Sequence, residues 1–235
     1  MDENKNQNSN ANLGENVNQN IGDDLKNETI NTVKDVKDTV KNINFKEEAK
    51  NGQSYLSELC KNPAEKIEDI ANDTENRHFK SAILAIIIWM VIALIEAISI
   101  YNVSFEYFMK NIFNIILLII TPIISILVLS VLVMIFNKEN KKSLNTIITT
   151  VTTAKLPVIL GDLIGLLYIV SSKSTTITTP IANFLHVIST ILLFFGIKSL
   201  YGTEDNDKSI KEFALVMAGF YIVRFVLTYL NISML

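Results

Sequence analysis

The chain has 235 residues, of which 49% are apolar, and a formal net charge of −3; its single cysteine, Cys60, excludes an intramolecular disulfide. The acidity lies at the start, because residues 1–80 hold 16 Asp and Glu against 11 Lys and Arg, whereas the remainder holds 8 against 10. This balance gives no reason to expect nucleic-acid binding, and the long uncharged runs after residue 80 predict an integral membrane protein.

Residues 1–28 consist mainly of Asn, Gln and acidic residues, and we expect them to be disordered because they cannot bury enough apolar surface to offset chain entropy. From Thr29 to Lys50 apolar residues recur at helical steps: Ile30, Val33, Val36, Val40 and Ile43. Lys34, Lys37 and Lys41 flank one edge of this stripe, as expected for a helix on anionic headgroups. A helix that packs on itself or on a protein partner explains the valine-rich stripe equally well.

A second short helix is predicted from Asn62 to about Asn72, with Pro63 in its first turn. Its apolar residues Ile67 and Ile70 are too few to form a core. Residues 1–80 are therefore predicted to be a polar, largely disordered and partly amphipathic cytoplasmic tail, and residues 81–235 a five-helix transmembrane domain.

The predicted fold is all-α, with five transmembrane helices: Ala82–Ile100, Ile112–Phe136, Ile147–Val170, Ile181–Leu200 and Phe213–Ile232. The second span has no charge and exceeds the roughly 20 residues that cross a bilayer. The third is less regular, because its first half is rich in threonine and contains Lys155. This span is predicted to be either tilted with a wet face or partly interfacial.

Lys and Arg alternate between the two sides of these spans, which sets the predicted orientation. One set of flanks carries Lys61, Lys66, Arg77, Lys80, Lys138, Lys141, Lys142, Lys208 and Lys211, and the other carries only Lys110 and Lys173. The pattern predicts a multi-pass protein of the cell membrane with a cytoplasmic N-terminus and an external C-terminus.

Ionisable residues inside spans cost about 2.5–3.5 kcal/mol on insertion scales, so each is a candidate functional residue. They are Glu96, Lys155, Asp162, His186 and Arg224. We expect Arg224 to pair with Asp162 or Glu96 and hold the helices together; the alternative is a proton or ion relay. His186 is predicted to be a polar residue near the membrane surface.

Small residues predict close helix packing at Gly161 and Gly165 in the third span, and at Ala214 and Ala218 in the fifth. Pro122 and Pro157 predict kinks, because each removes a backbone hydrogen bond within its span.

Catalytic signatures are absent from the sequence: it has no Gly-x-Ser-x-Gly, no His-Glu-x-x-His and no Gly-rich phosphate loop. The ionisable residues of the spans also do not supply the Ser/His, paired Asp or metal-ligand sets of an intramembrane protease. We therefore expect no enzymatic activity, no metal and no cofactor.

Two segments carry a family resemblance: Thr153–Leu160 (TAKLPVIL), at the third span, and Phe195–Tyr201 (FGIKSLY), before the last span. With the polar tail and five closely spaced spans, residues 78–235 resemble the Yip family of integral membrane proteins, which has bacterial relatives. The resemblance implies a non-enzymatic protein that organises partners or the bilayer. The Gly-Pro element of eukaryotic members and the zinc ribbon of some bacterial relatives are not recognisable. The interaction with Rab GTPases for which the eukaryotic members are named is therefore not carried over to this chain.

These observations predict a membrane interaction or organising module, with the lipid bilayer as one partner and a protein partner reached through the N-terminal tail. An oligomer is compatible with the small-residue strips. The alternative is a small transporter or channel component with a polar path around Lys155, Asp162 and Arg224.

Overall fold

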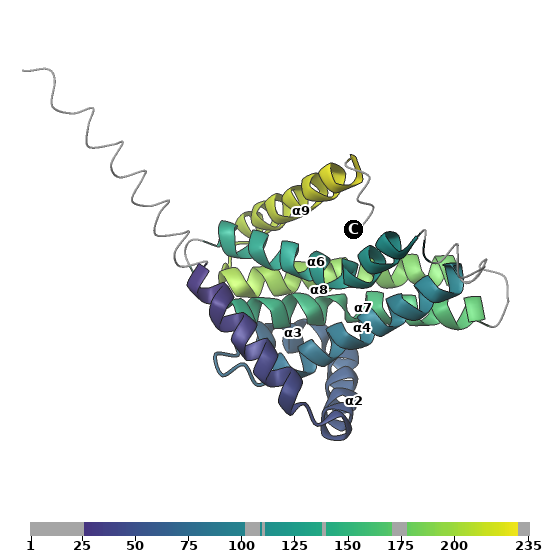
Figure 1. The fold of residues 1–235 in the computed structure, drawn as a ribbon. Coiled ribbons are helices and arrows are strands. Elements are labelled where there is room, and N and C mark those ends of the chain that lie inside the picture. Colours follow the sequence, from purple (N-terminus) through teal and green to yellow (C-terminus); the bar gives the residue numbers. More distant parts are fainter. Residues whose placement is uncertain (1–25, 102–108, 110, 138–139, 171–177, 230–235) are drawn as a thin grey trace, which may run out of the picture. The chain divides into compact units, whose positions relative to one another are not determined.

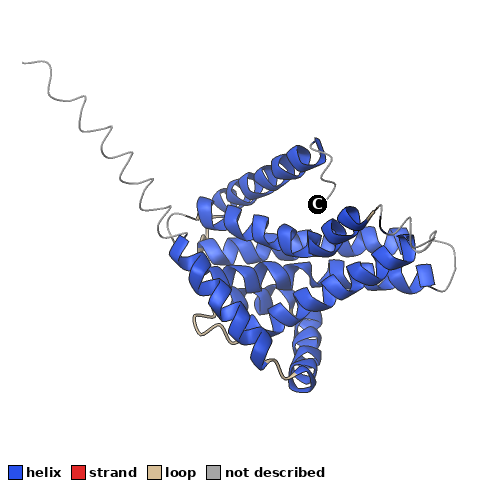
Figure 2. Ribbon diagram, in the orientation of Figure 1, coloured by secondary structure: helices blue, strands red, loops and turns tan. Residues whose placement is uncertain are grey.

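The computed structural model describes residues 26–101, 109, 111–137, 140–170 and 178–229. Within these ranges every regular element is a helix and none is a strand, which confirms the all-α prediction (Figure 2). The predicted disorder of residues 1–28 lies mostly outside the described residues; residues 26–28 already belong to a helix.

The chain divides into two compact units, Met1–Asn42 and Ile43–Leu235. The described part of the first unit is a helix over residues 26–42. The single helix predicted for Thr29–Lys50 is therefore wrong in one respect, because it stops before Ile43. Asn44 begins a new helix there by accepting a hydrogen bond of 3.4 Å on its side chain from the backbone N–H of Glu47.

The described residues of the second unit form these helices: α2 (Phe45–Lys61), α3 (Pro63–Ala71), α4 (Phe79–Tyr101), α6 (Ile112–Phe136), α7 (Leu144–Val170), α8 (Thr178–Tyr201) and α9 (Asn206–Tyr229) (Figure 1). α3 starts with Pro63 in its first turn, as predicted. α4, α7 and α8 begin three residues before the predicted starts at Ala82, Ile147 and Ile181.

Four helices of the described residues are long and apolar enough to cross a membrane: α4, α6, α7 and α8. α9 coincides with most of the predicted fifth span, but its described part also carries charged residues: Asp207, Lys208, Lys211, Glu212 and Arg224. The chain is therefore a multi-pass membrane protein, and the crossing of α9 stays a prediction.

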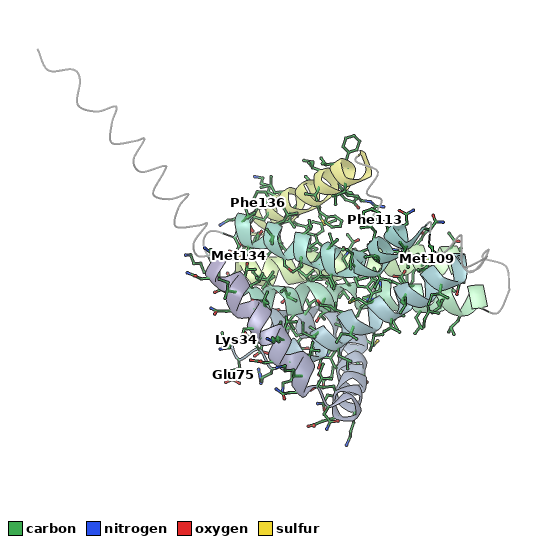
Figure 3. All side chains as sticks on the ribbon, viewed as in Figure 1. Lys34, Glu75, Met109, Phe113, Met134 and Phe136 are labelled. Atoms are coloured by element: carbon green, nitrogen blue, oxygen red, sulfur yellow. The ribbon has the colours of Figure 1, made fainter. Side chains whose placement is uncertain are left out.

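α7 is the helix around which the second unit is built. It packs against α3, α4, α6 and α8, whereas α9 packs against α6 and α8. Large apolar side chains project from the outer faces of the helices, among them Met109 and Phe113 (Figure 3). In a bilayer these exposed faces contact lipid.

The threonine-rich first half of α7 is enclosed by protein. Thr149, Thr150 and Thr153 are at most 4% exposed, and each hydroxyl donates to the carbonyl four residues earlier at 2.8–2.9 Å. Because these hydroxyls are satisfied within their own helix, the threonine methyl groups can pack against neighbouring helices. The wet face that the sequence led us to consider for this half of the span is not observed.

Gly196 marks a close approach of α8 to α7. A Cβ atom at Gly196 would lie 2.8 Å from Cγ2 of Thr150, whereas one at Gly165 would meet nothing within 4 Å. The Thr150 methyl belongs to a stiff β-branched side chain that is 1% exposed, so it has little room to move.

We therefore predict that Gly196→Ala destabilises the protein, by about 1–3 kcal/mol from overpacking. Gly165→Ala is the matched control, and it should be neutral or gain up to about 1 kcal/mol of helix propensity. Thermal unfolding of both variants in detergent measures the difference. Equal midpoints would show that α7 and α8 are not in close contact at Gly196.

Candidate functional site

A polar contact joins two membrane helices at the centre of the predicted ionisable cluster. The indole N–H of Trp89 on α4 donates to a carboxylate oxygen of Asp162 on α7 at 2.7 Å. Trp89 is 9% exposed, and a buried indole N–H needs an acceptor. Asp162 was predicted from the sequence, whereas Trp89 was not. The available signal was that Trp89 is the one Trp in the chain and lies within a predicted span.

Two further predicted residues lie within electrostatic range of Asp162. Glu96 on α4 interacts with it as a like charge, and His186 on α8 as an opposite charge when protonated. Glu96, Asp162 and His186 lie on three helices, and each of the other two is within electrostatic range of Asp162.

The two basic residues of the predicted cluster lie near one another. Nζ of Lys155 on α7 is 5.9 Å from the centre of the Phe220 ring on α9, and Lys155 interacts with Arg224 as a like charge. Arg224 itself is exposed on α9. The pairing of Arg224 with Asp162 or Glu96 stays a prediction.

The predicted packing residues occupy different environments. Gly161 lies against α8, since a Cβ there would be 3.4 Å from Leu185 and 3.6 Å from Ala182. Ala214 and Ala218 are exposed on α9, whose inward face includes Val216 and Gly219. Pro122 and Pro157 are buried inside α6 and α7, both of which continue past the proline.

A second polar cluster joins α2, α3 and the start of α4, and it was not predicted from the sequence. The Tyr55 hydroxyl of α2 is hydrogen-bonded to the hydroxyl of Thr153 on α7. The centres of the Tyr55 and His78 rings are 5.4 Å apart. Nζ of Lys66 lies 5.6 Å from the centre of the Tyr55 ring. Lys66 also forms an ion pair of 2.7 Å with Glu58.

The protonation equilibria of this cluster follow from its packing. Burial raises the pKa of Tyr55, and the hydrogen bond from Lys66 lowers the pKa of Glu58. Burial also lowers the pKa of His78, and the positive charges of Lys66 and Arg77 act in the same direction. Asp73 and Glu58 oppose that shift without reversing it.

The turn between α3 and α4 holds the beginning of α7. Asp73 is 5% exposed and accepts hydrogen bonds of 3.2 Å from the backbone N–H of Glu75 and from Nε of Arg77. Burial alone would raise the pKa of Asp73, but these hydrogen bonds outweigh it and lower the pKa. The Thr146 hydroxyl donates to the Asp73 carbonyl at 3.3 Å, which ties the turn to α7.

Apolar contacts complete this junction. Ile67 and Ile70 of α3 are fully buried, and a Cβ at Gly196 of α8 would lie 3.7 Å from Ile67. The two side chains are too few for a core of their own, as the sequence indicated, but they join a core that α7 and α8 supply. We call Ile67, Ile70, Thr150 and Gly196 the α3 junction.

The architecture defines the class of protein: an all-helical, multi-pass membrane protein with short helices packed on its spans. A family model described as "Yip1 domain" matches residues 58–230, so the chain belongs to the Yip1 domain family. The match begins within α2 and therefore includes the α3 junction as well as the spans. No curated protein and no solved structure matches the chain.

The lowered pKa of His78 predicts a pH dependence of stability. Between its folded pKa and its ordinary value of about 6.5, the unfolded chain binds more protons at this site than the folded protein. The His78 contribution is therefore present above the ordinary pKa and is lost as the pH falls below it. Thermal unfolding in detergent at pH 7.5 and 5.5 should show a smaller acid-induced decrease for His78→Gln than for the unsubstituted protein.

Lys66→Gln provides a second variant for this test. Removing its charge should move the His78 titration, followed by NMR of the imidazole, to higher pH. A titration that does not respond to Lys66 would contradict the arrangement of the cluster.

Proposed function

We propose that the protein is a non-enzymatic membrane interaction module that presents cytoplasmic helices on a helical bundle. The observation that carries this proposal is the α3 junction, where a polar helix is fixed to two membrane helices by Ile67 and Ile70. Relative to water, burying two isoleucine side chains contributes roughly 3–6 kcal/mol. A helix held in this way offers a partner a preorganised surface.

Two further observations support an interaction role. The outward positions of α3 carry exposed Glu65, Glu68 and Asp69, and polar residues of this kind do not contribute to the packing of the bundle. The first 42 residues form a unit of their own, as suits a segment that reaches a protein partner. The division of roles that we propose is a polar tail over residues 1–80 and a transmembrane domain over residues 81–235.

The proposed orientation has five spans, a cytoplasmic N-terminus and an external C-terminus, in the cell membrane. The alternation of Lys and Arg supports it, since basic residues are retained on the cytoplasmic side. In this arrangement α2, α3 and the turn after α3 all lie in the cytoplasm.

This orientation predicts the labelling pattern of single cysteines introduced into a Cys60→Ser protein. In intact cells an impermeant thiol reagent should label Leu235→Cys and Ser174→Cys, but should label Asn140→Cys and Asn206→Cys only after lysis. Protection of Leu235→Cys in intact cells would exclude five crossings.

The alternative function is transport or conduction. The convergence of Glu96, Asp162 and His186 from three helices favours it, because ionisable groups inside a membrane protein often line a path for protons or ions. The enclosed threonine half of α7 favours the interaction module, since those side chains pack against protein.

A double-substitution cycle at Asp162 and Arg224 tests the ion pair, and a flux measurement on the same variants tests transport. If Arg224 and Asp162 form a pair, Asp162→Asn should lower the folded yield more than Arg224→Leu, because a buried carboxylate can take up a proton whereas a guanidinium keeps its charge. The double variant should then recover part of the yield. Folded yield in detergent and proton flux into proteoliposomes are the measurements.

Strictly additive losses of yield would refute the pair. Normal yields for Asp162→Asn, combined with the loss of a proton flux that the unsubstituted protein shows, would replace the interaction module by a proton pathway.

A further inference from the structure

The helix over residues 26–42 has an exposed apolar stripe. Ile30, Val33 and Val40 are 57%, 61% and 49% exposed, although each is a large apolar side chain. At about 3.6 residues per turn these three positions fall on one side of the helix. An apolar stripe on an exposed helix marks a surface that binds something.

The charges of this helix are sorted by face. Lys26, Lys34, Lys37 and Lys41 lie along the edge next to Ile30 and Val33, whereas Glu28 and Asp35 lie on the opposite side. Asp38 lies beside Lys34 and Lys41, on the side away from Val33 and Val40. The helix therefore presents a combined apolar and basic surface, even though its net charge is close to zero. Glu28 and Asp35 point away from that surface.

We propose that the helix over residues 26–42 binds an anionic lipid bilayer surface, lying in the plane of the headgroups with Ile30, Val33 and Val40 inserted. Charge complementarity identifies this occupant, because lysines beside an apolar stripe match phosphate headgroups above acyl chains. The valines and one isoleucine offer too little apolar area to bind without the charges.

The chain connectivity favours the same partner. Only Ile43 and Asn44 separate this helix from α2, and α2 belongs to the unit that contains the membrane helices. A short linker gives the helix a high effective concentration at the bilayer, so weak intrinsic affinity suffices. The inference deepens the proposed function by assigning one surface of the tail to lipid, and it stands even if no protein partner binds α3.

The test uses the full chain in lipid nanodiscs. Cys60, which is free and exposed, is replaced by serine, and an environment-sensitive fluorophore is attached through Val33→Cys. Asp38→Cys, which lies about 140° around the helix from Val33, is the matched control. Quenching by doxyl-labelled lipid reports insertion, and quenching by aqueous iodide reports exposure to water.

In discs that contain phosphatidylglycerol, the Val33 label should be quenched by doxyl lipid and protected from iodide, and the Asp38 label should show the reverse. In discs of phosphatidylcholine alone, or at high salt, the lipid quenching of the Val33 label should be lost. Replacing Lys34, Lys37 and Lys41 together by glutamine should have the same effect.

Three results would overturn the proposal. Iodide-accessible labels at both positions in anionic discs would show that the helix stays in water. Lipid quenching that is unchanged without the lysines or the anionic lipid would remove the charge complementarity. A Val33 label shielded from both quenchers would show that a protein surface covers the stripe.

Discussion

The burial of Ile67 and Ile70 between α7 and α8 is the interaction on which the rest of the arrangement depends. Ile67 packs beside Gly196, whose missing side chain lets α8 approach the Thr150 methyl group on α7. Thr150 satisfies its hydroxyl within α7, which leaves that methyl group free to pack. The outer positions of α3 carry charged residues, which favour water over lipid. Burial of Ile67 and Ile70 is therefore counted relative to water. The hydrophobic effect therefore fixes α3 to the spans, although it contributes little between the spans themselves.

The polar contacts around the junction follow from that docking. Once α3 is in place, the turn after it brings the Asp73 carbonyl to Thr146. Tyr55 on α2 meets Thr153, so α2 and α3 both contact the polar half of α7. Farther along α7, Asp162 is held by Trp89. Thr146, Thr153 and Asp162 of α7 thus each have a hydrogen-bond partner on another helix or turn, as a membrane environment favours.

The sequence predicted the helices well and their partners poorly. Apolar runs mark spans directly, so α6 has the predicted bounds, but the break before α2 depends on one capping side chain, Asn44. Asp162 was a visible candidate because charge inside a span is costly. Its partner Trp89, and the pairing of Thr153 with Tyr55, depend on the register between helices, which the sequence does not show. His78 was overlooked because its environment is built by α2 and α3, which were treated as tail.

Amide hydrogen exchange of the full-length protein in nanodiscs tests the docking of α3 most directly. Residues 63–71 form a nine-residue helix, which would exchange rapidly if it were only a solvated segment. We predict that their amides exchange as slowly as those at the start of α7, and that Ile67→Ala accelerates exchange in α3. Rapid exchange of residues 63–71 in the unsubstituted protein, with slow exchange in α7, would contradict the account.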